Sequence, residues 1–218
     1  MTQRSVLLGG LAAAASLLPF AAHAHPHVLV DARSEVVFDD QGRMASVRQV
    51  WQFDPAFSAY AIQGLDTDGD GQLSDAELQP LAKVNVDSLH EFDFFTYLTI
   101  GDTPIKFVDP KEYWLEMNGE NLVLFYDLPL ETPTAVGPDT ILEVFDPEYF
   151  VAFNFVKDDP VTISNAPSGC SAVYHPPGQI DAQTMAMLGA IPQDQRELPP
   201  ELAGAADDLA NTATISCK

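Results

Sequence analysis

Residues 35–42 read Glu-Val-Val-Phe-Asp-Asp-Gln-Gly, an apolar run that stops abruptly in polar turn residues. A β-rich segment begins upstream at Val28, and residues 45–53 resume the same composition downstream. Two runs rich in β-branched and aromatic residues on either side of an Asp- and Gly-containing turn are typical of a hairpin. The stretch therefore predicts a pair of strands within residues 27–54.

The same signal recurs through the middle of the chain. Turn residues separate short β-rich runs, which indicates an antiparallel sandwich or a barrel-like sheet. The candidate strands are 97–100, 105–108, 112–117, 122–128, 140–145, 149–155, 161–164 and 171–174. Between the hairpin and these strands, two helical segments are expected, 55–65 and 75–95. The predicted fold is mainly β: an antiparallel β-sandwich-like domain, residues 25–175, with a helical insertion at about 55–95.

Residues 1–24 have the pattern of a secretory signal peptide. Arg4 precedes an apolar stretch that ends at Ala22-His23-Ala24, which fits a small-x-small cleavage site. Pro19 and the short apolar core argue against the alternative, a buried or transmembrane helix. We therefore expect export to the periplasm and a mature chain that begins at His25 and is not embedded in the membrane.

The remaining residues, 176–218, differ in composition and are expected to form a loosely packed, partly helical tail. The chain has two cysteines, Cys170 and Cys217. In an exported protein two cysteines are expected to join in a disulfide. A thiolate metal site is the alternative, although the Cys-x-x-Cys spacing typical of such sites is missing. The sequence therefore predicts a tail tied to the β-rich domain by a disulfide.

The chain is strongly acidic. Ten Lys and Arg side chains oppose 32 Asp and Glu side chains, which gives a formal net charge of −22. This balance argues against nucleic acids and anionic membrane surfaces as partners, because both require a basic patch. It is compatible with binding cations. The sequence contains no Gly-rich phosphate loop, HExxH motif or Ser/His/Asp arrangement, so we do not expect an enzyme.

Residues 66–77 match the twelve-residue calcium loop of an EF-hand, a helix-loop-helix motif. The candidate calcium ligands, at positions 1, 3, 5, 7, 9 and 12, are Asp66, Asp68, Asp70, Gln72, Ser74 and Glu77. Gly71 at position 6 permits the sharp turn that the loop needs. A helix capping box from Ser74 to Glu77 is the alternative, but it leaves three alternating aspartates unexplained. A single loop in an extracellular compartment predicts bound Ca²⁺ in a structural role.

Cleavage after Ala24 would leave His25-Pro26-His27 at the start of the mature chain. Two imidazoles and a free α-amine are good ligands for zinc, copper or nickel. His90 and His175 can complete such a site if the fold brings them close. The alternative is an ordinary exposed chain terminus. The candidate transition-metal ligands are His25, His27, His90 and His175.

Several segments together resemble a family of exported bacterial proteins of unknown function. These segments are 25–30 (His-Pro-His-Val-Leu-Val), 51–54 with Phe57-Ser58, 66–77, 94–96 and 146–150 (Asp-Pro-Glu-Tyr-Phe). Members of the family are described as the periplasmic component of an uncharacterised transport system. The family is similar to the soluble partner of the Zev-type zinc uptake system and is associated with membrane proteins similar to nickel and cobalt exporters. The resemblance, over residues 25–175, implies metal handling beside a membrane metal transporter.

The chain departs from some similar proteins, because it has neither a His-rich stretch nor a C-terminal membrane helix. A high-capacity metal store is therefore not expected. The leading hypothesis is a periplasmic protein that delivers or buffers a divalent transition metal, with zinc first, and carries a structural Ca²⁺. A calcium-binding interaction module without a transition metal is one alternative. A copper-dependent enzyme that uses its N-terminal histidine is another.

Overall fold

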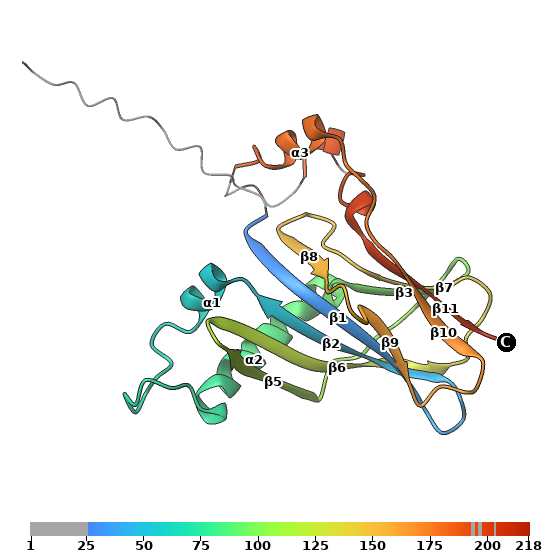
Figure 1. Ribbon diagram of the computed structural model, residues 1–218, viewed down its shortest axis with the longest axis horizontal. Coiled ribbons are helices and arrows are strands. Elements are labelled where there is room, and N and C mark those ends of the chain that lie inside the picture. Colours follow the sequence, from blue (N-terminus) through green and yellow to red (C-terminus); the bar gives the residue numbers. More distant parts are fainter. Residues whose placement is uncertain (1–25, 193–194, 196–197, 203) are drawn as a thin grey trace, which may run out of the picture.

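The computed structural model describes residues 26–192, 195, 198–202 and 204–218; the predicted signal peptide and His25 lie outside this part of the chain. Two β-sheets pack face to face, with helices at one end of the large sheet and beyond the small one (Figure 1). The expectation of a mainly β fold is confirmed.

The large sheet has six strands in the order β5-β6-β2-β1-β8, and β9 also pairs with β1. Their bounds are β1 (Val28–Phe38), β2 (Met44–Phe53), β5 (Glu112–Asn118), β6 (Asn121–Thr134), β8 (Val151–Phe155) and β9 (Val161–Ser164). The hairpin predicted from residues 35–42 is β1–β2, with Val36 opposite Val47. Its turn forms because the Asp39 carboxylate accepts hydrogen bonds from the backbone N–H groups of Gln41 and Arg43.

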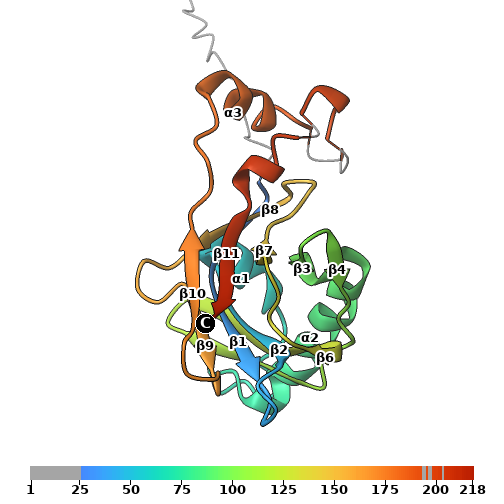
Figure 2. The same ribbon diagram turned by 90° about the vertical axis from the view of Figure 1, so that its right-hand side faces the viewer.

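The small sheet has five strands in the order β10-β11-β7-β3-β4. Their bounds are β3 (Thr96–Ile100), β4 (Thr103–Ile105), β7 (Thr140–Val144), β10 (Cys170–His175) and β11 (Asn211–Cys217). Figure 2 shows the two sheets from the side, with α3 beyond them. Most of these strands lie where the sequence predicted them, but β11 was not predicted. It forms because Ala213 and Ile215 are buried while Thr212 and Thr214, which alternate with them, are only partly buried.

The helices lie in the connections between strands, as separate pieces. They are α1 (Pro55–Ala61), α2 (Asp75–Leu89), η1 (His90–Phe95), α3 (Ala182–Leu188), η2 (Pro200–Leu202) and η3 (Asp207–Leu209). The helix expected over 75–95 ends as an α-helix at Leu89. Asp93, Phe94 and Phe95 then have positive φ angles of 50, 55 and 47°, and this left-handed turn places the last two in the core.

Among the described residues, buried apolar side chains form three clusters, and the smallest packs Leu188, Leu202 and Ala206 of the C-terminal segment against Tyr149. The other two lie against the large sheet. Between the sheets, buried side chains of β1 and β2 meet those of β3, β7 and β11. At the other end of the large sheet, α2 covers the inner face with Leu78, Ala82 and Val86, which pack in one cluster with Trp51 and Leu115. The outer face of the large sheet is left to solvent by the described elements.

The strand directions differ from the expected antiparallel arrangement at one edge. Residues 28–32 of β1 pair in parallel with β8, and residues 34–37 pair in parallel with β9. The chain crosses from β7 in the small sheet to the far edge of the large sheet and then runs alongside β1 in the same direction. The large sheet is therefore mixed rather than purely antiparallel.

The predicted disulfide between Cys170 and Cys217 is present. The two residues lie directly opposite each other at the ends of β10 and β11. The segment 176–218 is thus joined to the β-rich domain both by this bond and by a strand in the interior of the small sheet. A disulfide is compatible with an extracytoplasmic location. Across the described ranges, no helix is both long and apolar enough to cross a membrane.

Candidate functional site

The acidic loop between α1 and α2 is shaped by its own carboxylates. Asp66 accepts hydrogen bonds from the backbone N–H groups of Gly69 at 2.8 Å and Gly71 at 3.0 Å. Asp68 accepts from the N–H of Asp70, and Asp70 accepts from the N–H of Gln72. Gly69 and Gly71 have φ angles of 75 and 81°, so the chain turns back through conformations that favour glycine. The loop consequently curls around its aspartates.

The result is a convergent set of oxygen atoms. One carboxylate oxygen from each of Asp66, Asp68 and Asp70 lies within 4.8 Å of the others, and all three residues are exposed. Three negative charges at this separation repel one another unless a cation is shared between them. Carboxylate oxygens are the ligands that Ca²⁺ prefers in proteins. The three carboxylates therefore lie close together, and their assignment as calcium ligands stays a prediction.

Glu77 has different neighbours from the three aspartates. Its carboxylate accepts hydrogen bonds from the backbone N–H and hydroxyl groups of Thr67 and of Ser74, at 2.7–3.0 Å. These hydrogen bonds lower the pKa of Glu77 to about 2. The contact with the Ser74 N–H is the capping-box contact at the start of α2. Glu77 thus connects Thr67, near the start of the loop, with Ser74, near its end. The sequence analysis did not anticipate that Thr67 takes part.

The loop is attached to the protein at both ends. Leu65 and Leu73 pack against the core that α2 forms with the large sheet. Asp54 caps α1 and also accepts a hydrogen bond from the backbone N–H of Leu29 in β1. However, α1 ends at Ala61, so a short turn separates it from the loop. The helix before the loop is shorter than the expected 55–65.

His27 lies against the turn formed by residues 146–150. Its backbone N–H donates to the Phe150 carbonyl at 2.8 Å, and its ring stacks on that of Phe150 with centroids 4.4 Å apart. The turn is held by Asp146, whose buried carboxylate accepts hydrogen bonds from the N–H groups of Glu148, Phe150 and Val151. The sequence marked this segment only by resemblance. An Asp followed by Pro was the local signal of a side-chain-stabilised turn.

The other histidines lie elsewhere. His90 in η1 has its Nδ1 atom 2.7 Å from Asp109 Oδ1. His175 at the end of β10 has its Nε2 atom 3.0 Å from Thr214 Oγ1 in β11. Within the described ranges, no group of three close metal-ligating side chains includes a histidine. His25, the remaining candidate, lies outside the described residues.

Comparison with known proteins gives the chain a family. Residues 10–217 match the family described as "Protein of unknown function (DUF1007)". The chain belongs to the DUF1007 family. One similar protein, from Haemophilus influenzae, is 24% identical over 199 residues, which cover 90% of this chain and 91% of that protein. It is called an uncharacterized protein.

A second similar protein comes from Spirochaeta aurantia. It is called an uncharacterized 15.5 kDa protein in the trpE 3′ region. It is 25% identical over 114 residues, which cover 50% of this chain and 77% of that protein. Neither name states an activity, so function in this DUF1007 member has to be argued from its own residues.

Proposed function

We propose that this DUF1007 protein is an exported, non-enzymatic metal-binding protein that holds a structural Ca²⁺ in an EF-hand-like loop. We further propose that it delivers or buffers a divalent transition metal, with zinc first, for a membrane transporter. The observation that carries the calcium part is the convergence of Asp66, Asp68 and Asp70 within 4.8 Å.

The loop offers a full set of hard oxygen ligands. The three aspartates supply carboxylate oxygens, and Gln72 supplies a backbone carbonyl at position 7. Ser74 supplies a hydroxyl or holds a water, and Glu77 supplies two oxygens at position 12. Glu77 accepts hydrogen bonds from Thr67 and Ser74 on both carboxylate oxygens, so it would have to exchange some of these for the cation.

A structural role follows from where the loop is attached. Leu65, just before the loop, and Leu73, within it, pack on the same core as α2. A cation that binds only the folded loop stabilises the folded state by RT ln(1 + [Ca²⁺]/Kd). Calcium binding would therefore strengthen the attachment of α2 to the large sheet rather than create a new surface.

The transition-metal part rests on the chemistry of the histidines at the start of the mature chain. His27 contacts Phe150 through its ring and its backbone N–H, and Phe150 belongs to the turn that Asp146 holds. Cleavage before His25 would add a second imidazole and an α-amine to this end of the chain. The resemblance to the Zev-type zinc uptake partner supports delivery to a transporter, and the acidic surface supports the accumulation of cations. His90 and His175 would serve separate sites.

Elemental analysis of the mature protein tests both parts. The protein would be exported, cleaved and titrated with zinc, copper and nickel in excess calcium. One equivalent of a transition metal beside one of calcium is the expected result. Calcium alone would support the second candidate, a calcium-dependent interaction module, which the separation of His27, His90 and His175 favours. A redox-active copper site would instead point to the copper-dependent enzyme.

A matched pair of variants locates the transition metal. One residue added before His25 blocks chelation by the α-amine, whereas His90→Ala leaves that end of the chain intact. The extension is expected to weaken zinc binding more than His90→Ala does. Equal affinity in the extended and mature proteins would remove the α-amine from the site.

A further inference from the structure

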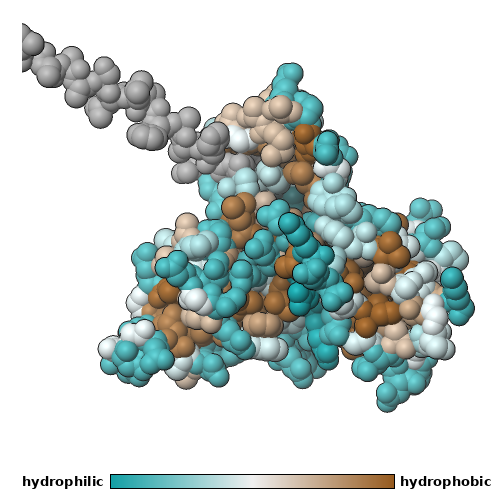
Figure 3. All heavy atoms as spheres, viewed as in Figure 1, coloured by the Kyte–Doolittle hydropathy of each residue, from teal (hydrophilic) through white to brown (hydrophobic). Residues whose placement is uncertain are grey.

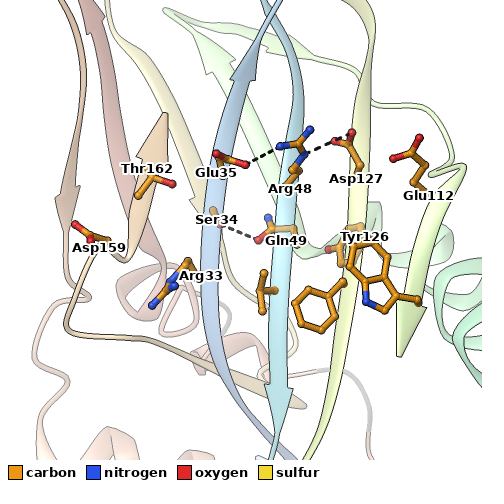
Figure 4. Close-up of a pocket in the computed structure, with 13 residues that line it drawn as sticks. Arg33, Ser34, Glu35, Arg48, Gln49, Glu112, Tyr126, Asp127, Asp159 and Thr162 are labelled. Carbon is orange, nitrogen blue, oxygen red and sulfur yellow. Dashed lines mark hydrogen bonds and ion pairs between the residues drawn. The ribbon is translucent and has the colours of Figure 1, made fainter. Parts of the chain in front are cut away.

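The outer face of the large sheet carries three aligned rows of side chains that no function considered above uses. The register places Arg33, Val50, Phe125 and Trp114 opposite one another across β1, β2, β6 and β5. One neighbouring row is Glu35, Arg48, Asp127 and Glu112, and the other is Asp31, Gln52, Val123 and Glu116. A mostly apolar row therefore runs across the sheet between two polar ones. Figure 4 shows one of the polar rows, from Glu35 through Arg48 and Asp127 to Glu112.

This face is hollowed rather than flat. Two adjoining concavities of about 580 and 460 Å³ share Arg33, Val50 and Phe125 in their walls. Among the described elements, α2 lies on the opposite face of the sheet, as Figure 1 shows. In the space-filling view, hydrophobic side chains lie between hydrophilic ones on the side that carries this face (Figure 3). We call the surface formed by the three rows the outer groove.

The floor of the outer groove is aromatic at one end. Trp114 is 44% exposed. Its ring stacks on Phe125 with centroids 4.9 Å apart and planes 3° apart. Its indole N–H donates to Glu116 at 2.7 Å, which fixes the ring.

The charge of the outer groove has a clear sign. Arg33 and Arg48 are its cations, and its carboxylates are Asp31, Glu35, Glu112, Glu116, Asp127 and Asp159. Arg48 contacts Glu35 at 3.0 Å and Asp127 at 3.9 Å, so one cation serves two acids. In the described part of the chain, Asp31, Glu112 and Asp159 have neither an ion pair nor a side-chain hydrogen bond. The apolar row is thus bordered by more carboxylates than the two arginines can neutralise.

We propose that the outer groove binds a basic peptide segment of another protein, with apolar side chains over Val50, Phe125 and Trp114. Lys or Arg side chains of that segment would pair with Glu112 and Glu116 at one end and Asp31 at the other. The row spans three strand spacings, about 14 Å, which about four residues of extended chain can cover. A second copy of this chain is disfavoured as the occupant by the net charge of −22. The proposal does not depend on metal binding.

The test is a titration with a defined peptide. The mature chain, in calcium and separately in chelator, is titrated with acetyl-Lys-Phe-Lys-Val-Lys-Phe-Lys-amide. Backbone amide shifts and Trp fluorescence are followed. Saturable binding is expected in both buffers, with the shifts on β1, β2, β5 and β6 and an affinity that falls as salt is added. A peptide with Glu in place of each Lys is expected not to bind.

Variants then separate the apolar row from the charges. Trp114→Ala is expected to weaken binding about tenfold or more, as truncation of a central aromatic anchor does. Glu112→Gln with Glu116→Gln is expected to weaken binding and flatten the salt dependence. Two exposed positions outside the groove, Tyr60→Ala and Asp102→Asn, serve as controls and should leave the affinity unchanged.

Three outcomes would overturn the proposal. The first is the absence of saturable binding. The second is a shift pattern centred away from the outer groove, for example on residues 66–77; this comparison uses the unaltered protein and so holds even if Trp114→Ala fails to fold. The third is equal binding of spermidine and the peptide, which would show that charge alone attracts cations and that the apolar row plays no part.

Discussion

Gln49 in β2 donates a hydrogen bond from its buried amide nitrogen to the Thr96 hydroxyl of β3, at 3.0 Å, and so connects the two sheets. The amide oxygen of Gln49 accepts from the Ser34 hydroxyl at 2.7 Å. Thr96 in turn donates to the carbonyl of Phe94, in the left-handed turn after α2. A chain of hydrogen bonds thus runs through the core from Ser34 in β1 to Phe94 in the turn that follows α2.

Breaking this chain of hydrogen bonds should destabilise the protein. Gln49→Leu keeps a similar volume but leaves the hydroxyl groups of Ser34 and Thr96 buried without this partner. Its expected cost is about 1–3 kcal/mol in the free energy of unfolding. Urea denaturation checks it, with the exposed turn variant Gln41→Ala as a control that should change little. A stability equal to that of the unaltered protein would show that water replaces the amide.

Removing charge from the acidic loop should remove its response to calcium. In Asp68→Asn and Asp70→Asn, the side-chain oxygen can still accept the loop's backbone hydrogen bonds, so the turn is preserved while a cation ligand is weakened. We expect the rise of Tm with added calcium to shrink strongly in each variant. Asp102→Asn, in the turn between β3 and β4, is the matched control and should keep the full rise. A calcium-independent Tm in the unaltered protein would refute the structural role.

Glu77 should make the calcium-free protein sensitive to acid. Its pKa is lowered from 4.5 to about 2 in the folded state by the hydrogen bonds from Ser74 and Thr67. A lowered pKa means that the ionised carboxylate favours folding above pH 4.5 and that this contribution is lost as the pH falls toward 2. In chelator, Glu77→Gln should therefore reduce the loss of stability between these pH values. Parallel pH profiles for the two proteins would contradict the assignment.

Breaking the disulfide should weaken the small sheet. Cys170 and Cys217 are separated by 47 residues in sequence, and closing a loop of this length stabilises the folded state by about 4 kcal/mol. Replacing both with Ser should lower the free energy of unfolding by about this amount, which a lower urea midpoint would show. Reductant should have the same effect on the unaltered protein. Reductant added to the double variant is the control. An unchanged midpoint would mean that strand pairing alone holds β10 to β11.

Much of the local structure could be predicted from the sequence, because local chemistry determines it. The Asp39 turn and the apolar runs around it define the β1–β2 hairpin, and three alternating aspartates define the acidic loop. The strand β11 was missed because Ala-rich sequence precedes it and its own alternation rests on two buried residues, Ala213 and Ile215.

Long-range relationships could not be predicted in the same way. Nothing in the sequence of β8 or β9 encodes the direction in which it lies beside β1. The alignment of Arg33 with Trp114 depends on three strand pairings at once, so the outer groove is visible only in the fold. The placement of His27 on Phe150 likewise joins segments that are far apart in sequence.

The pairings that complete the two sheets join segments that are far apart in the sequence. β1 needs β8 and β9, and β10 and β7 need β11, so neither sheet can close until most of the chain is available. Folds dominated by such distant pairings form slowly, because the entropy cost of closing long loops comes before the stabilising contacts can form. If the chain is exported through a secretory signal, as we propose, it has to cross the membrane before it folds, and slow closure of both sheets would keep it unfolded during that step.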